Sequence, residues 1–453
     1  MKRVHAFFGA LGVAVVSIVI AATASVAPAM AVGTGTWSVQ NGNADGGLHG
    51  IWFADKLHGW AVGEGASGSS NKILKTVNGG ATWTVPTTVP GTDTLNRVFF
   101  SDATHGLAVG EPSDGPDAAA LRTSDGGDTW TQATSGTGNN DLEAVYMFPD
   151  NLTAYASGSS GTLIKTLDGG ATWADASAGL PAISDGNNET TKSYSIDAMW
   201  WPSATEGWLA GNRLDDATPG LILHTINAGI TWTVVDSHTD TGGYESMMFT
   251  DANHGWAVGD CKSTTTTPSP SPSTTVSPSP VTTCDRGGLS KWDGSKWTNV
   301  SPSQAVGYDL QGVWFVDSTH GWVVGDSSED ANAPGRFRVI LYTADGGVTW
   351  TEQVDTGPQP TPSSASINAD SGLTFVYATD LCHAWASGGE SLILGYVDSC
   401  PTPAASQAAA TVGLPAAGVG SSPVSTFWNV LAVVVVASVP FAALLRRRAS
   451  RRR

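Results

Sequence analysis

One eight-residue turn motif occurs five times in this chain and strongly limits the folds that the chain can adopt. Each copy is close to Thr-x-Asp/Asn-Gly-Gly-x-Thr-Trp, and the copies cover residues 76–83, 123–130, 166–173, 225–232 and 343–350. The Asp or Asn side chain can bond nearby backbone amides, and glycine allows the positive φ of a tight hairpin. Because a catalytic group is needed only once, a turn that recurs in this way indicates a structural fastening element.

A second motif precedes the turns and resembles Phe-x-Asp-x-x-His-Gly-Trp-Ala-Val-Gly. Clear copies cover residues 51–64, 98–111, 247–260 and 313–326, and weaker copies cover 145–158, 198–211 and 376–388. Each unit predicts four short strands, and such units repeat every ~50 residues in β-propellers. The sequence therefore predicts an all-β, seven-bladed β-propeller of four-stranded blades, although merging one weak unit would leave six.

The predicted propeller spans residues 32–400. Its blades are expected near 48–85, 95–132, 142–175, 194–234, 244–300, 310–352 and 371–399. The last unit lacks a Thr-Trp strand, whereas residues 35–40 form a strand without a unit of its own. We expect this N-terminal strand to complete the seventh blade, because closing the ring removes open sheet edges.

The Asx and tryptophan side chains of the turns are assigned structural roles, setting the turn and covering apolar surface between sheets. They are Asn78, Asp125, Asp168, Asn227 and Asp345, with Trp83, Trp130, Trp173, Trp232 and Trp350.

The two ends of the chain predict export and anchoring. Residues 1–31 have a basic start, an apolar stretch and small residues before position 32, as in a secretory signal peptide. Residues 427–445 are apolar and about long enough for a transmembrane helix, and the basic residues 446–453 should stay in the cytoplasm. The body is then displayed outside the cell membrane, tethered by its C-terminus through a stalk at 401–426.

The charge balance of the exported body is strongly acidic. Eight of the 22 basic residues and none of the 40 acidic residues lie in the end segments, which leaves 14 bases against 40 acids and a net charge of −26. Phosphate binding requires the opposite sign, so nucleic acid is not expected as a partner. A basic protein surface, a basic peptide or another cation fits this charge better.

Four cysteines agree with export to an oxidising compartment. Four cysteines allow three pairings, and we favour the local pairs Cys261–Cys284 and Cys382–Cys400. Free thiols or a zinc site are the alternatives, although no Cys-x-x-Cys pair is present. Cys261 and Cys284 bracket a Ser/Thr/Pro-rich insert at 262–283, which is either a site of O-glycosylation or a tolerated surface insertion.

The candidate binding residues follow the second predicted strand of several blades. Glu64, Glu111, Asn212, Asp260 and Asp326 occupy equivalent positions there. Loops at this end vary most in length, so we expect an acidic ring that binds a cation or a basic peptide; solvated loop carboxylates are the alternative. The histidines at equivalent first-turn positions (His58, His105, His254, His320 and His383) are expected to cap turns, and no metal site or cofactor is predicted.

Together, the two motifs closely resemble the repeats of the photosynthesis system II assembly factor family, the Ycf48/HCF136-like propellers. The turn alone resembles the Asp-box, or BNR, repeat of sialidases and related propellers. The resemblance covers about residues 35–399 and implies a non-catalytic binding or assembly factor, although a role dedicated to photosynthesis is not expected for this chain. The segment LPAAG at 414–418 resembles a sortase signal, with Leu414, Pro415 and Gly418 matching and Ala417 replacing the usual threonine; a simple membrane tether is the alternative.

Three function classes follow, of which the first is favoured: a surface-anchored scaffold that binds an envelope protein. The second is a glycosidase or carbohydrate-binding protein, because paired carboxylates can hydrolyse sugars. Sialidases use a cluster of arginines, and the body contains only Arg97, Arg122, Arg213, Arg286, Arg336 and Arg338. The third is a passive structural protein of the envelope.

Overall fold

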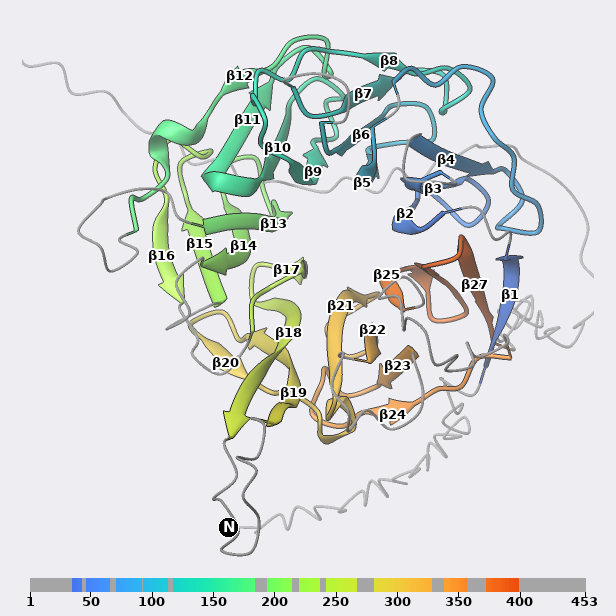
Figure 1. The fold of residues 1–453 in the computed structure, drawn as a ribbon, viewed down its shortest axis with the longest axis vertical. Coiled ribbons are helices and arrows are strands. Elements are labelled where there is room, and N and C mark those ends of the chain that lie inside the picture. The colour runs from blue at the N-terminus through green and yellow to red at the C-terminus, as the bar shows by residue number, and fades with distance from the viewer. Residues whose placement is uncertain are drawn as a thin grey trace, which may run out of the picture. The chain divides into compact units, whose positions relative to one another are not determined.

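The computed structural model is an all-β structure in which seven antiparallel sheets surround a central axis (Figure 1). It describes residues 35–42, 46–65, 71–91, 93–112, 117–183, 194–213, 220–236, 242–266, 281–327, 338–356 and 372–398. The predicted seven-bladed propeller is therefore confirmed. The predicted signal peptide, stalk, sortase-like segment and membrane helix all lie outside the described residues. Within those described ranges, no helix is long and apolar enough to cross a membrane.

The first four blades follow the chain in order. They consist of β2 (Leu48–Phe53), β3 (Gly59–Glu64) and β4 (Asn71–Thr76); β5 (Leu95–Phe100), β6 (Gly106–Gly110), β7 (Ala120–Thr123) and β8 (Thr131–Gln132); β9 (Leu142–Met147), β10 (Ala154–Gly158), β11 (Thr162–Thr166) and β12 (Ala174–Asp175); and β13 (Tyr194–Trp200), β14 (Gly207–Arg213), β15 (Gly220–Thr225) and β16 (Thr233–Asp236). The first strand of each blade lies nearest the axis (Figure 1).

The last three blades complete the ring. They consist of β17 (Ser246–Asp251), β18 (His254–Thr266), β19 (Val281–Trp292) and β20 (Trp297–Asn299); β21 (Tyr308–Phe315), β22 (Gly321–Ser327), β23 (Arg338–Thr343) and β24 (Thr351–Glu352); and β25 (Leu373–Asp380), β26 (His383–Gly388), β27 (Leu392–Val397) and β1 (Thr36–Gly42). The described residues also contain the short 3-10 turns η2 (Ser159–Gly161), η3 (Ser177–Gly179) and η4 (Ser303–Ala305).

The first blade departs from the prediction of four strands, because its sheet contains only three. The expected fourth strand is reduced to a single bridge between Lys75 and Thr84. Pro86 follows closely, and proline has no backbone N–H to continue the ladder.

The N-terminal strand closes the ring as expected from the sequence. β1 pairs antiparallel with β27, with Trp37 opposite Tyr396. The Trp37 side chain is fully buried, and its Nε1 donates a hydrogen bond of 2.8 Å to Oε1 of Gln353 in the neighbouring sixth blade. This bond links β1, and with it the seventh blade, to the sixth blade.

Each turn motif is held by its own side chains. In the copy of the sixth blade, Thr343 Oγ1 donates to Asp345 Oδ1 and accepts from Gly347 N, while Asp345 Oδ1 accepts from Thr349 N. Gly346 and Gly347 have φ of 72° and 91°, which is why glycine is needed. The equivalent threonine–Asx bonds are Thr76–Asn78, Thr123–Asp125, Thr166–Asp168 and Thr225–Asn227.

The two motifs meet at the contacts between blades. Trp60 of the first blade stacks on Phe100 of the second at 3.4 Å between ring centroids, and its Nε1 donates to the Gly126 carbonyl at 2.9 Å. Trp130, the last residue of that turn motif, meets Phe100 edge-on at 5.8 Å. Trp256, Phe315 and Trp350 repeat this arrangement between the fifth and sixth blades. The turn thus fastens one blade to the next, which explains why it recurs in most blades.

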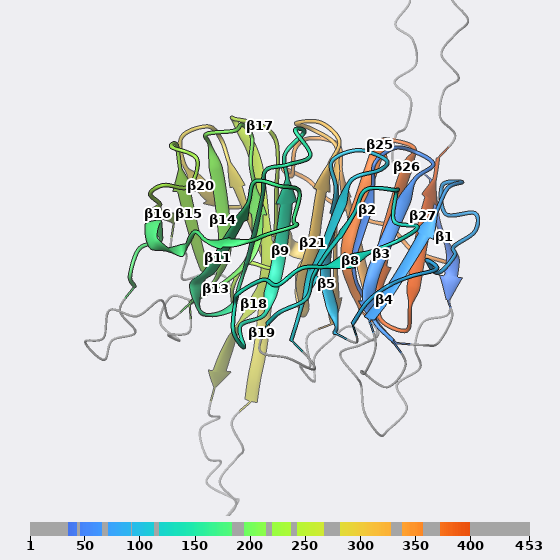
Figure 2. The same cartoon turned by 90° about the horizontal axis from the view of Figure 1, so that it is seen from above.

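The fifth blade carries an extension. Strands β18 and β19 continue past the ends of neighbouring strands (Figure 2) and remain paired as far as Thr266 and Val281. The predicted low-complexity insert therefore begins and ends as strand, and residues 267–280 lie outside the described residues. Cys261 and Cys382 are both disulfide-bonded. The side chain of Cys284 and all of Cys400 lie outside the described part, so the two pairings stay predictions.

Candidate functional site

The predicted binding residues lie at one end of the central region that the innermost strands line, which we call the channel (Figure 1). Glu64 ends β3, Glu111 directly follows β6, and Asp260 and Asp326 lie on the second strands of their blades. Because adjacent strands are antiparallel, the second strands end where the innermost strands begin. This places residues from the start of the innermost strands beside the predicted acidic ring.

Carboxylates from the innermost strands join the predicted residues at this end. Asp309 on β21 lies directly opposite Asp326 on β22, and Gln311 donates to Asp260 Oδ1 at 3.4 Å. Asn212 Nδ2 bridges Asp197 Oδ2 at 2.9 Å and Glu245 Oε1 at 3.1 Å. We call the following set the acidic mouth: Glu111, Asp141, Glu143, Asp197, Glu245, Asp260, Asp309 and Asp326. Glu64 lies at its margin, where its charge acts on Glu111.

Sequence reasoning missed five members of this set: Asp141, Glu143, Asp197, Glu245 and Asp309. They do not follow the second-strand motif, and the chain presents different residues at the corresponding place in other blades, such as His49 and Asn96. An alignment of the residues around the first apolar position of each innermost strand could have found them.

Burial and mutual repulsion disfavour the charged forms of these carboxyl groups. Burial raises the pKa of Glu143 to about 7, with smaller upward contributions from the charges of Asp141 and Glu245 and an opposing one from Arg97. Burial and the charge of Asp309 likewise raise the pKa of Asp326 to about 7. Burial first, and neighbouring carboxylates second, also raise the pKa of Asp197 and Asp260 well above the ordinary value. The acidic mouth therefore favours any bound cation that compensates these charges.

Arg97 on β5 is the cation that faces this set. Its Nε donates to the Glu143 carbonyl at 3.3 Å, and its guanidinium lies 4.6 Å from the centre of the Phe375 ring. The charges of Glu143, Glu245 and Asp197 raise the pKa of Arg97, but burial outweighs them and lowers it. Among the described residues, Arg97 forms no ion pair with a carboxylate.

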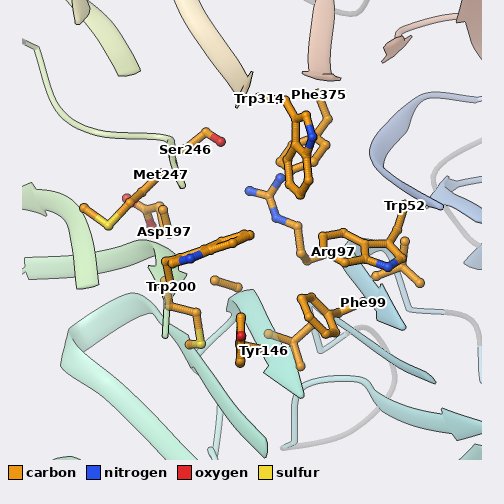
Figure 3. Close-up of a pocket in the computed structure, with 15 residues that line it drawn as sticks. Trp52, Arg97, Phe99, Tyr146, Asp197, Trp200, Ser246, Met247, Trp314 and Phe375 are labelled. Atoms are coloured by element: carbon orange, nitrogen blue, oxygen red, sulfur yellow. The ribbon is translucent and has the colours of Figure 1, made fainter. Parts of the chain in front are cut away.

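An aromatic layer crosses the channel beside Arg97. Trp52, Phe99, Tyr146, Trp200 and Trp314 come from five different innermost strands, and successive ring centroids lie 4.2 to 5.8 Å apart. This layer forms part of a pocket with about 440 Å³ of free space, some of it open to solvent. Figure 3 shows Arg97 reaching into the pocket between Trp314 and Trp200.

The histidines do not gather at the acidic mouth. Each bonds through Nδ1 to the aspartate three residues earlier in its own turn; the pairs are His58–Asp55, His105–Asp102, His254–Asp251, His320–Asp317 and His383–Asp380. These contacts fit the predicted turn-capping role. Throughout the described ranges, no group of three or more His, Cys, Asp or Glu side chains is arranged to hold a metal ion.

Comparisons with known proteins identify neighbours of the fold. No protein-family model matches the chain, and no curated protein matches it. A structure of YCF48 bound to a D1 peptide superposes with a TM-score of 0.54 at 18% identity, covering 82% of this chain and 97% of that one. YCF48 from Cyanidioschyzon merolae gives 0.53 at 19%, covering 80% and 98%.

Glycoside hydrolases share the same fold. The GH74 xyloglucanase from Xanthomonas campestris gives a TM-score of 0.53 at 16% identity, covering 80% of this chain and 53% of that one. The GH74 enzyme of Niastella koreensis gives 0.56 at 15%, covering 79% and 53%. This chain thus spans about half of each GH74 chain. The propeller fold is similar both to a protein solved with a bound peptide and to enzymes that act on polysaccharide.

Proposed function

We propose that this chain is a non-catalytic binding protein that takes up a basic segment of a partner protein at its acidic mouth. The observation that carries the proposal is the gathering of eight carboxyl groups at one end of the channel, with Arg97 as the cation facing them. Lysine or arginine side chains of a partner would compensate charges that the fold itself leaves poorly compensated.

Peptide binding by a similar propeller supports this proposal. The YCF48 neighbour was solved with a D1 peptide, so a propeller of this kind can present a peptide-binding surface. The ligand chemistry proposed here comes from this chain's own residues, since residues 32–400 contain 40 acids against 14 bases. Charge complementarity of this kind mainly raises the rate and specificity of association.

The proposed setting is the outer surface of the cell membrane or the cell wall. The signal-like segment 1–31 and the apolar segment 427–445 support export and C-terminal anchoring. In that setting the acidic mouth would hold an envelope protein in place during assembly.

A binding titration tests the proposal. The purified full-length chain would be titrated with a lysine-rich synthetic peptide and with a glutamate-rich peptide of equal length. We expect only the lysine-rich peptide to bind, with an affinity that falls as salt is raised because exposed charges are screened. The double variant Asp260→Asn/Asp326→Asn should bind about tenfold more weakly.

The matched control removes two exposed acids away from the channel, Asp128→Asn and Glu352→Gln. Equal weakening in both double variants would mean that net charge, rather than the acidic mouth, attracts the peptide. If the lysine-rich peptide does not bind the parent chain, the proposal is wrong, and a passive structural role becomes the better explanation.

A second candidate is a glycoside hydrolase. It is favoured by the GH74 neighbours and by the pKa of about 7 for Glu143 and Asp326, since a general acid must hold a proton near neutral pH. Release of reducing sugar from xyloglucan or related polysaccharides, abolished by both Glu143→Gln and Asp326→Asn, would support this candidate over the binding role.

A further inference from the structure

We propose that the pocket beside Arg97 binds a small zwitterion of the α-amino acid class, with its carboxylate on the Arg97 guanidinium and its ammonium group toward Asp197. This site lies against the aromatic layer and needs no protein partner, so it goes beyond the role proposed for the acidic mouth. Arg97 and Asp197 come from different strands and both line this pocket (Figure 3).

Most hydrogen-bond donors of the Arg97 guanidinium have no acceptor among the described residues. A guanidinium carries five N–H donors, and in the described part of the chain only its Nε has an acceptor, the Glu143 carbonyl. Phe375 supports the flat face of the guanidinium at 4.6 Å, which orients its remaining edge toward the pocket. A planar group with a free fork of donors matches a carboxylate, which can accept two parallel hydrogen bonds.

Asp197 provides the carboxyl group, and an ammonium group bound beside it would favour its charged form. Only 7% of this residue is exposed, and Ser195 Oγ and Asn212 Nδ2 both donate to its carboxylate, which fixes its orientation. Although Arg97 is near enough to act on its pKa, the two side chains form no ion pair within the described residues. The fold therefore holds a guanidinium and a carboxyl group apart across a cavity. A zwitterionic ligand would pair with the guanidinium through its carboxylate and would favour the charged form of Asp197 through its ammonium group.

The remaining walls define the rest of the ligand. Ala144, Ala198 and Ser246 are small residues on three successive innermost strands, and they leave the space beside Arg97 open. Trp200 and Trp314 form apolar walls next to it. These apolar walls suit the side chain of an amino acid such as leucine or phenylalanine, which can pack against the aromatic rings.

Calorimetric titration of the full-length chain at neutral pH tests the proposal. L-leucine and L-phenylalanine are each compared with two derivatives: the amide, which lacks the carboxylate, and the N-acetyl form, which lacks the ammonium group. We expect at least one free amino acid to bind, and both of its derivatives to bind at least about tenfold more weakly, because each leaves one charged protein group without a partner. Indole fluorescence should change on binding, since Trp52, Trp200 and Trp314 line the pocket.

Two variants locate the site. Arg97→Gln should weaken binding of the amino acid about 100-fold, because two charge-assisted hydrogen bonds are lost. Ala198→Leu should block the pocket while it keeps Arg97 in place. Arg122→Gln, on a strand away from the axis, is the matched control and should bind like the parent chain. Melting curves of each variant show whether the fold is intact.

Several results would overturn the proposal. They are the absence of heat with both amino acids in the folded parent chain, tighter or equal binding of either derivative, and unchanged binding by a folded Arg97→Gln or Ala198→Leu variant. The double variant Asp260→Asn/Asp326→Asn should keep amino-acid binding while it binds the lysine-rich peptide about tenfold more weakly. Asp197 belongs to both sites, but Asp260 and Asp326 belong only to the acidic mouth, so this variant distinguishes failure of the pocket from failure of the acidic mouth.

Discussion

Replacing Glu143 by glutamine should make the protein more stable at alkaline pH and leave it unchanged near pH 4.5. Glu143 has a folded-state pKa of about 7 against an ordinary value of 4.5, mainly because burial disfavours its charge. Between these two pH values the folded protein keeps the proton that the unfolded chain releases. Stability therefore falls as the pH rises from about 4.5 to about 7, and the full penalty remains above that range.

The size of the effect follows from the same shift. Each pKa unit corresponds to about 1.4 kcal/mol, so charging Glu143 in the folded protein costs up to about 3 kcal/mol. Partial exposure of the side chain to water reduces the expected value to about 1–2 kcal/mol. Glutamine keeps the shape and can still accept the hydrogen bond from Asn96 Nδ2, which is 2.9 Å long in the parent chain.

Urea unfolding of the full-length chain at pH 4.5 and pH 8 measures this difference. Glu352→Gln, on the exposed outer strand β24, is the control and should change stability little at either pH. A Glu143→Gln variant that is less stable than the parent at pH 8 would refute the reasoning. It would mean that attraction to Arg97 outweighs the cost of burying the carboxylate.

Three further predictions concern the elements that fasten the blades. Gly106→Ala should destabilise the protein by about 1–3 kcal/mol, because a Cβ there would lie 2.5–2.6 Å from the Phe100 ring. Gly47→Ala is the control, since a Cβ at Gly47 would have no neighbouring atom closer than 3.4 Å. Equal melting temperatures for the two variants would contradict the prediction. Thr343→Val should lower the free energy of unfolding in urea by about 1–2 kcal/mol, since Gly347 N and Asp345 lose their hydrogen-bond partner. Thr351→Val, at an exposed position, should leave the free energy of unfolding unchanged. Trp37→Ala should lower the free energy of unfolding by about 3–5 kcal/mol and expose β1 to limited proteolysis, because this fully buried side chain joins β1 to two blades. If the variant resists the protease as well as the parent chain does, β1 does not close the ring.

The fold could be predicted from the sequence because its fastening contacts are local or periodic. Thr343, Asp345 and Gly347 lie within five residues of one another, so the turn is encoded in one short segment. The contact between Trp60 and Phe100 is long-range, but both residues belong to a motif that recurs at the same step. Because the motif repeats, contacts between residues far apart in the chain can be recognised from the sequence.

The site could be predicted only in part, because its members lie outside any repeated motif. Asp260 and Asp326 each follow a recognisable Val-Gly pair, so the sequence alone predicts that they occupy equivalent positions. Glu143, Asp197 and Glu245 replace one another in different blades, and they meet only because the innermost strands converge on the axis. Single residues whose identity changes from blade to blade carry no periodic signal.

Because burial and mutual repulsion disfavour the ionised carboxylates of the acidic mouth, binding of a basic peptide should change the stability of the protein in a pH-dependent way. A basic peptide that contacts Glu143 and Asp326 should lower their pKa toward the ordinary range, because a nearby positive charge favours the carboxylate. Saturating peptide should therefore stabilise the parent chain more at pH 8 than at pH 5, and this difference should shrink in the Glu143→Gln variant. Urea unfolding with and without peptide at both pH values measures this linkage. A stabilisation that is the same at both pH values would mean that the peptide binds elsewhere, and the raised pKa values would then reflect only the packing of the channel.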